Sequence, residues 1–148
     1  MIKLELVPIS ISDIALLDKT EYKGLSAKNR EKLVDDSERF MHNGEFFRFF
    51  LIKDSGEFVG VINMCGHGAK TISVAPEILD GYKNKGYATN SLTLAYSLAK
   101  EKGFQLITAD IVKDNIASIN LHLKLGFQFV SERVSKSGKV LLTYQKRL

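Results

Sequence analysis

The stretch Asp80-Gly81-Tyr82-Lys83-Asn84-Lys85-Gly86-Tyr87-Ala88-Thr89 decides the fold, because it joins a strand pattern at residues 71–79 to a helix pattern at residues 88–102. The helix pattern places small and apolar side chains on one face, namely Ala88, Leu92, Ala95, Leu98 and Ala99. Small residues at 86 and 88 allow the backbone to approach a ligand, and the first turn of a helix offers unpaired N–H groups and a positive dipole end. The stretch is therefore a candidate phosphate-binding loop.

The loop does not match the best-known phosphate-binding patterns. Lys83 and Lys85 add positive charge, but the Gly-Lys-Ser/Thr of a P-loop and the Gly-x-Gly-x-x-Gly of a dinucleotide-binding fold are both missing. Taken alone, the loop fits an ordinary solvated turn between a strand and a helix better than it fits a ligand site.

A strand pattern returns at residues 104–112, after Gly103, which is suited to a left-handed helix cap. Residues 71–79, 88–102 and 104–112 therefore predict a βαβ unit with parallel strands and a right-handed crossover. A ligand cleft is expected at the carboxyl ends of these strands. Pro76 cannot donate a ladder hydrogen bond, so we expect it to bulge or bend its strand.

The N-terminal part predicts one strand and two helices. Residues 2–7 alternate as in a half-buried strand. Ser12 can cap a first helix and Ser26 a second, which is expected to carry Phe40 and Met41 and to end at Asn43-Gly44.

The remaining segments predict strands and one short helix. Residues 46–52 and 58–64 flank Asp54-Ser55-Gly56 and favour an antiparallel hairpin. A helix at about 116–124 precedes the strands 127–134 and 139–144, which flank the turn 135–138. The expected order is β-α-α-β-β-β-α-β-α-β-β, a mixed α/β fold that forms a single domain over residues 1–148.

Composition narrows the function classes. The chain has 148 residues, 45% hydrophobic and 26% charged, which is the balance of a globular protein. No apolar run approaches the roughly 20 residues of a membrane helix, so we expect a cytoplasmic protein. One cysteine and three scattered histidines indicate neither a disulfide nor a metal site. The net charge of +4 is spread along the chain, which does not predict binding to nucleic acid.

Two motifs in this order resemble the GNAT superfamily of N-acetyltransferases. Lys83-x-x-Gly86-x-Ala88 resembles the signature Gln/Arg-x-x-Gly-x-Gly/Ala, with lysine at the first position, where it keeps the charge and loses the planar fork. Residues 115–127 resemble the segment Asn-x-x-Ser/Ala…Leu-Gly-Phe, most closely in the branch of ribosomal-protein alanine and polyamine acetyltransferases. The predicted element order is also the order of that family.

The resemblance implies acetyl-CoA as cofactor and a primary amine as acceptor, either a protein N-terminus or a small molecule. It implies a mixed sheet that is splayed between strands 71–79 and 104–112. The cofactor would be held by the loop, by backbone N–H groups at the end of strand 71–79 and by the second motif: Ile78, Leu79, Lys83, Asn84, Lys85, Gly86, Tyr87, Ala88, Thr89, Asn115 and Ser118.

Direct attack of an amine on a thioester needs a proton for the departing thiolate and a base for the amine. His122 stands where many family members have a tyrosine and is a candidate acid, since a histidine has a reference pKa near ~6.5, although it could equally be a packing residue. Asp110 and Glu77 are weaker candidates for the base. Cys65 and His67 could share a strand face, but no third group orients a thiol nucleophile.

Two other functions stay open. The same fold could be a non-catalytic acyl-CoA-binding or regulatory module, since the tyrosine and a clear base are missing. A phosphate- or nucleic-acid-binding domain is a second alternative. The acceptor would contact the helices within residues 12–42 and the turn 135–138, and a homodimer is possible.

Overall fold

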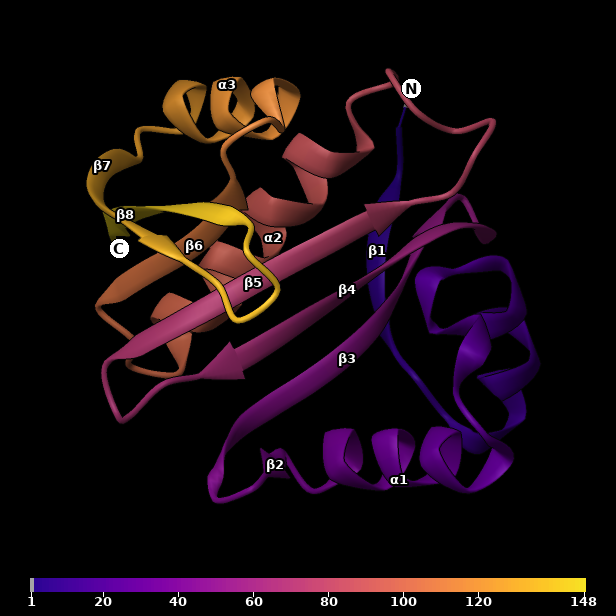
Figure 1. Cartoon of the computed structure of the whole chain (residues 1–148). Coiled ribbons are helices and arrows are strands. Elements are labelled where there is room, and N and C mark those ends of the chain that lie inside the picture. Colours follow the sequence, from indigo (N-terminus) through magenta and orange to yellow (C-terminus); the bar gives the residue numbers. More distant parts are fainter. Residues whose placement is uncertain (1) are drawn as a thin grey trace.

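The computed structural model describes residues 2–148 and contains one mixed eight-stranded sheet with helices packed against it (Figure 1). The strands lie in the order β1-β3-β4-β5-β6-β8-β7, and β2 pairs with β3 beside this path. Along the chain the elements are β1 (Leu4–Pro8), the 3-10 helices η1 (Ile11–Lys19) and η2 (Glu21–Gly24), α1 (Ala27–Glu38), β2 (Met41–His42), β3 (Glu45–Asp54), β4 (Glu57–Gly66), β5 (Thr71–Ile78), α2 (Tyr87–Glu101), β6 (Leu106–Val112), α3 (Ile116–Lys124), β7 (Gln128–Val134) and β8 (Val140–Arg147).

The predicted βαβ unit is β5, α2 and β6, and its two strands are parallel. They pair at three positions, from Thr71 opposite Leu106 to Ser73 opposite Thr108. Beyond Ser73 the two strands separate, while β5 stays paired with β4 as far as Ile78. The splayed mixed sheet expected from the sequence is thereby confirmed, and the separation opens the interior of the sheet.

Alternating side chains of the sheet build a core on each face. One core joins the apolar face of α2, including Leu92 and Ala95, to strand residues such as Ile62 and Ile72. The other core places Phe49 and Val61 beneath η1, η2 and α1. Neighbouring strand positions therefore face opposite layers, and this alternation decides which residues can reach the gap between β5 and β6 from each side.

The prediction of a bulge at Pro76 is wrong. Pairing between β4 and β5 continues through Ile62 opposite Pro76 without a register shift. The N–H of Leu79 donates to Val59 O at 2.9 Å, so by the alternation of an antiparallel ladder the nitrogen of Pro76 faces away from β4. The missing donor lies on the side where β6 has already separated, and no ladder bond is lost.

Two features of the N-terminal part also differ from expectation. The first predicted helix is the 3-10 helix η1, and α1 ends at Glu38, so Phe40 and Met41 lie outside it. Asn43-Gly44 is the turn of a small hairpin in which Met41 pairs with Phe46. Asn43 and Gly44 have φ of 50° and 79°, and a two-residue turn with both φ positive matches the twist of paired strands.

Among residues 2–148, no helix has the length and apolar character needed to cross a bilayer.

Candidate active site

The N-terminus of α2 is built to receive a ligand through its backbone. Gly86 is the N-cap residue with φ of 83°, in the left-handed region that favours glycine, and Asn84 just before it has φ of 64°. No side chain within the described part of the chain caps the helix. The first intrahelical bond runs from Asn90 N–H to Gly86 O, so the N–H groups of the first turn stay available for an anion.

A cavity of about 500 Å³ lies against this turn, and we call it the loop cavity. It is lined by β5, by the loop, by the start of α2 and by α3, which faces it with Asn115, Ser118 and His122. Nine of the eleven residues expected to bind the cofactor line it: Ile78, Lys83, Asn84, Gly86, Tyr87, Ala88, Thr89, Asn115 and Ser118. Its other walls are Pro76, Tyr82, Ala117, Leu121 and His122. The backbone donors, the loop and the room beside them fit the phosphates and the pantetheine arm of CoA.

The two loop lysines are loosely placed. Lys83 Nζ lies 3.3 Å from Asp80 Oδ1, and both side chains are mostly in solvent. Lys85 does not line the loop cavity, and its ammonium lies 5.8 Å from the ring centre of Tyr82. Charge from these lysines therefore supports an anion at long range, while the close contacts come from backbone N–H groups.

Tyr87 fixes the start of α2 to the sheet. Its hydroxyl donates to Asp54 Oδ2 at 2.6 Å, at the end of β3. This hydrogen bond, together with burial, raises the pKa of Tyr87 to about 12. Hydrogen bonds from Tyr87 and from the Lys3 N–H lower the pKa of Asp54. The side chain of Tyr87 is thus a structural anchor, and its contribution to a ligand would come from its backbone.

Asn115 caps α3. Its Oδ1 accepts the N–H of Ser118 at 3.1 Å, as expected for an N-cap asparagine. The cap begins α3 at the wall of the loop cavity and so sets where the next turns, with Ser118 and His122, stand.

The gap between β5 and β6 forms a second cavity of about 400 Å³, which we call the gap cavity. Its walls include Ser73, Ala75 and Asp110, which point to the face covered by α1, opposite to the face of α2. Pro76, Ser118 and His122 line both the loop cavity and the gap cavity. A group that enters along α2 can therefore meet a group that enters from the opposite face of the sheet.

One backbone donor at the end of β5 points into this gap. The N–H of Leu79 donates to Val59 O, and Leu79 does not line the loop cavity. Leu79 is therefore unsuited to the backbone contact with the cofactor that was expected of it. Alternation along the ladder turns the N–H of Ile78 to the other edge of β5, where β6 has separated. Gly60 lies opposite Ile78, and a Cβ there would be 2.3 Å from Glu77 O. The absence of a side chain at 60 therefore sets how closely β4 holds this part of β5.

His122 stands where the two cavities meet. It is buried, and its ring packs edge-on against Phe127 with 4.9 Å between ring centres. Its Nδ1 lies 2.7 Å from Ser118 O, and because a carbonyl only accepts, Nδ1 carries a proton. Nε2 has no hydrogen-bond partner among residues 2–148 in the structure, so it is the nitrogen that can exchange a proton with a ligand.

A second histidine approaches the gap from the other side. His67 Nε2 lies 2.8 Å from Ser73 Oγ, and Ser73 is the last β5 residue paired with β6. The sequence indicates His67 only as a partner of Cys65 and does not indicate Ser73, because the register that brings position 73 to the opening is set by pairing across the sheet.

The two acidic candidates are already engaged. Asp110 accepts from Thr143 Oγ1 at 2.6 Å and from Arg133 Nη2 at 2.7 Å. Burial raises the pKa of Asp110, but these hydrogen bonds outweigh it and hold the pKa below its usual range. Glu77 accepts the N–H of Glu21 with both oxygens at 3.0 to 3.1 Å and lies outside the gap cavity. Burial raises the pKa of Glu77.

Comparison with known proteins identifies the family. A family model described as the acetyltransferase (GNAT) domain matches residues 3–128. The chain belongs to the GNAT acetyltransferase family. As such it is an N-acetyltransferase that uses acetyl-CoA, in agreement with the two motifs. No curated protein sequence matches the chain.

Solved GNAT structures share the whole architecture. RimL, a ribosomal L7/L12 alpha-N-protein acetyltransferase solved with coenzyme A, superposes with a TM-score of 0.82 at 16% identity, covering 98% of this chain and 94% of RimL. The spermidine/spermine N-acetyltransferase SpeG from Vibrio cholerae gives 0.82 at 14%, with 98% and 92% covered. The protein yncA from Salmonella typhimurium, solved with its cofactor acetyl-CoA, gives 0.77 at 17%, with 98% and 94% covered. At these identities the likeness shows the fold.

Proposed function

We propose that this GNAT enzyme acetylates a primary amine by direct attack, with the two substrates meeting in the gap between β5 and β6. The observation that carries the proposal is that His122, Ser118 and Pro76 line both the loop cavity and the gap cavity. One cavity has the helix N-terminus suited to CoA phosphates, and the other opens on the opposite face of the sheet.

Acetyl-CoA, when bound, supplies the thioester whose carbonyl carbon is attacked. In this proposal the Ile78 N–H donates a hydrogen bond to the carbonyl oxygen, which gains negative charge during the attack. When protonated at Nε2, His122 can give that proton to the departing sulfur, because its Nδ1–H is held by Ser118 O. These two groups serve the side of the gap that holds the thioester.

Ser73 and His67 serve the acceptor side. Ser73 Oγ can take a proton from the attacking amine while passing its own to His67 Nε2, 2.8 Å away. His67 is exposed, so water stabilises the positive charge that it then carries. The amine loses one proton to this pair and the sulfur gains one from His122, so the protons balance over the reaction.

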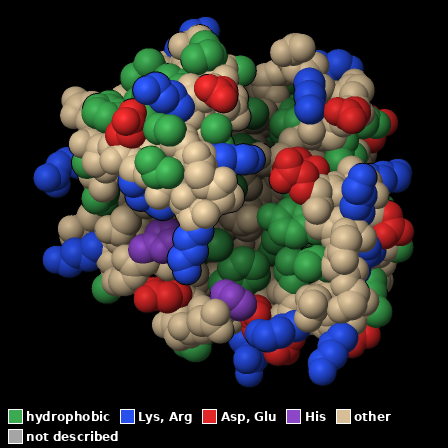
Figure 2. All heavy atoms as spheres, viewed as in Figure 1, with side chains coloured by type: hydrophobic (Ala, Val, Ile, Leu, Met, Phe, Trp, Pro, Cys, Tyr) green, Lys and Arg blue, Asp and Glu red, His purple; other side chains and the backbone are tan. Residues whose placement is uncertain are grey.

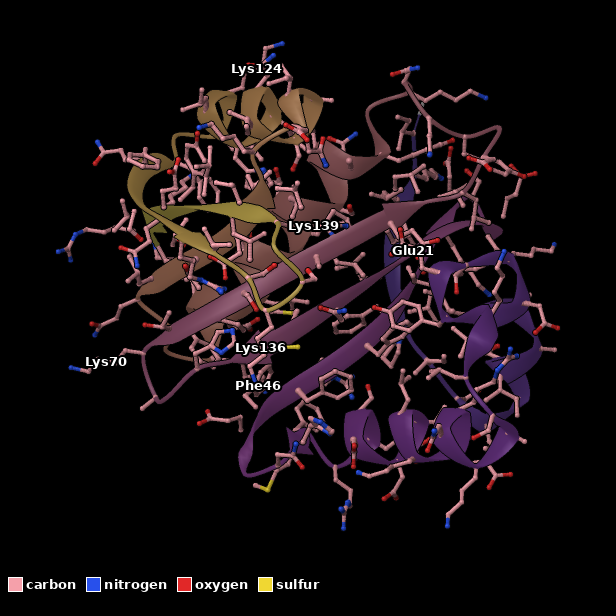
Figure 3. The ribbon with its side chains drawn as sticks, viewed as in Figure 1. Glu21, Phe46, Lys70, Lys124, Lys136 and Lys139 are labelled. Carbon is pink, nitrogen blue, oxygen red and sulfur yellow. The ribbon has the colours of Figure 1, made fainter. Side chains whose placement is uncertain are left out.

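The proposed acceptor is a primary amine. RimL acts on ribosomal L7/L12 and SpeG acts on spermidine and spermine. Protein N-termini and small polyamines are therefore both acceptors of proteins with this fold. In the view of Figure 3, Lys136 and Lys139 of the turn between β7 and β8 lie in front of β5, with Glu21 of η2 to one side, and these are two of the segments from which we expect acceptor contacts. A cytoplasmic location and a homodimer stay predictions from the sequence.

The test is steady-state release of CoA with a panel of amines, for the natural chain and for His122→Ala. We expect His122→Ala to lower kcat by about 100-fold or more, the usual weight of acid–base catalysis, with the Kd of CoA nearly unchanged. Asn120→Ala is the matched control, because Asn120 is an exposed residue of α3 outside both cavities. An unchanged kcat would remove His122 from the mechanism. Binding of acetyl-CoA without release by any amine would favour the non-catalytic module.

A further inference from the structure

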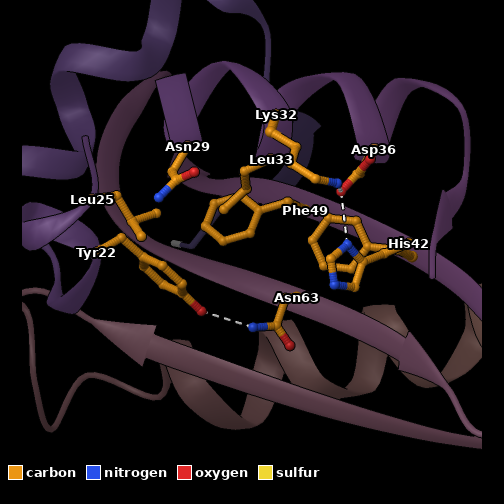
Figure 4. A pocket seen from close by; sticks show the side chains of 10 residues that line it. Tyr22, Leu25, Asn29, Lys32, Leu33, Asp36, His42, Phe49 and Asn63 are labelled. Atoms are coloured by element: carbon orange, nitrogen blue, oxygen red, sulfur yellow. Dashed lines mark hydrogen bonds and ion pairs between the residues drawn. The ribbon is translucent and has the colours of Figure 1, made fainter. Parts of the chain in front are cut away.

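A third cavity of about 350 Å³, which we call the side pocket, lies between α1, η2 and the strands β3 and β4 (Figure 4). Its walls are mainly apolar, with Leu25, Leu33, Phe47, Phe49 and the ring of Tyr22. Phe49 is fully buried, and Tyr22 packs edge-on against it with 5.1 Å between ring centres. The pocket therefore has firm walls and room for one apolar side group.

The side pocket adjoins the gap cavity across one pair of strands. Asn63 of β4 lines the side pocket, and its cross-strand partner Ala75 of β5 lines the gap cavity. Directly paired residues point to the same face, and neighbouring strands lie about 4.8 Å apart. Figure 2 shows a hollow at the centre of this face, with hydrophobic side chains exposed within it. A molecule whose amine lies in the gap beside β5 can therefore reach the side pocket by extending over the neighbouring strand β4.

The boundary between the two cavities carries one donor and one acceptor. Asn63 Nδ2 donates to the hydroxyl oxygen of Tyr22 at 2.8 Å (Figure 4). The proton of the Tyr22 hydroxyl is then available to a ligand carbonyl. Asn63 Oδ1 accepts a long contact from Cys65 Sγ at 3.8 Å and has a second lone pair for a ligand N–H. An amide group, which has one carbonyl and one N–H, complements this pair.

The charges near the pocket do not favour a polycation. Asp36, at the far end of the side pocket, is paired with Lys32 Nζ at 2.9 Å and with His42 Nδ1 at 2.7 Å. Asp110 in the gap cavity is paired with Arg133. These carboxylates are neutralised within the protein, so a chain of ammonium groups would find little compensation for its desolvation there.

We infer that the acceptor is a primary amine joined through an amide to an aromatic or branched apolar group, and that this group occupies the side pocket. The inference rests on the proposed acetyl transfer and specifies its substrate. The amine faces Ser73 and His67, the amide meets Tyr22 and Asn63, and the apolar group packs against Phe49.

Acceptor pairs test this on the natural chain. We expect kcat/KM for glycyl-phenylalaninamide to exceed that for glycyl-glycinamide by roughly 10- to 100-fold, the worth of burying one large apolar side chain. Phenethylamine, which lacks the amide, and spermidine should both be poorer acceptors. Equal rates for the two dipeptide amides, or preference for phenethylamine or spermidine, would overturn the inference while leaving acetyl transfer established. A longer peptide with the same first two residues should be a better acceptor if the source is a protein N-terminus and an equal one if it is a small amide.

A pocket-filling variant locates the effect. Asn29 is an exposed residue of α1 whose side chain points between Leu25 and Leu33 (Figure 4), so Asn29→Phe should fill the cavity and abolish the preference for phenylalanine. Ala27→Phe adds the same ring to an exposed position of α1 outside the pocket and should retain the preference.

Binding separates failure of this inference from failure of the proposed function. If no amine is acetylated, calorimetry with N-acetyl-glycyl-phenylalaninamide and CoA-loaded protein still probes the pocket. Binding that Asn29→Phe weakens at least tenfold and Ala27→Phe leaves intact supports the inference. Absence of binding, or equal binding by both variants, overturns it.

Discussion

A methyl group on Gly60 would displace the strand that carries the proposed carbonyl contact. A Cβ at this position would lie 2.3 Å from Glu77 O and 3.2 Å from Ile78 Cα. Because Cβ contacts essentially never fall below 3.0 Å, β5 has to move by about 0.7 Å, the difference between 3.0 and 2.3 Å. Overpacking of this kind costs about 1–3 kcal/mol of the free energy of unfolding. A reacting group misplaced by about 1 Å can lose about 100-fold in rate, so we expect Gly60→Ala to lower kcat by roughly 10- to 100-fold.

The assay combines CoA release at saturating substrates with urea unfolding of the same samples. Gly24→Ala is the control, because Gly24 has no atom within 4 Å of a built Cβ and does not have a positive φ. It should change neither kcat nor stability by much. A Gly60→Ala enzyme that is less stable by the expected amount but keeps its kcat would refute the placement of the reacting carbonyl beside Ile78.

Four further substitutions test the loop, the anchor and the proton relay. Lys83→Ala should change the Kd of CoA less than about threefold because Lys83 is exposed. Gly86→Ala should weaken binding roughly 5- to 30-fold, because an alanine leaves the left-handed region when the site is empty and returning to it on binding costs about 1–2 kcal/mol. Calorimetry compares the two variants, and the reverse order would contradict backbone binding. Tyr87→Phe should lower Tm between about pH 4 and 10. The difference from the natural chain should shrink at lower pH, as Asp54 with its lowered pKa takes up a proton, and at higher pH, as Tyr87 with its pKa of about 12 ionises; thermal unfolding across pH measures this, and a difference independent of pH would exclude the hydrogen bond as its cause. His67→Gln should lower kcat about 100-fold at neutral pH, and an unchanged kcat would remove the relay.

Much of the fold could be predicted because the decisive signals are local. The periodicity of residues 88–102, the loop before them and the second motif at 115–127 identify the family without knowledge of the pairing. The misassigned elements are those in which one short pattern has two physical outcomes. Asn43-Gly44 suits a helix end and also a two-residue hairpin, and only the pairing of Met41 with Phe46 distinguishes them.

The site could be predicted only where it is local. The loop residues 83–89 and Asn115 were expected, and all of them except Lys85 line the loop cavity. The effect of Pro76 depends on which edge of β5 its nitrogen faces, and the choice of Ile78 over Leu79 depends on the same register. The side pocket depends on Tyr22 meeting Asn63, 41 positions apart in sequence, which no local pattern contains.

Acetyl transfer itself is tested most directly by measuring both products of one reaction. The chain is mixed with acetyl-CoA carrying a labelled acetyl group and with a primary amine, and released CoA and labelled N-acetylamine are quantified by mass spectrometry. We expect acetyl transfer to give the two products in equal amounts, to depend on the amine and to fall in His122→Ala. Tight binding of acetyl-CoA with no amine-dependent release of CoA would contradict it.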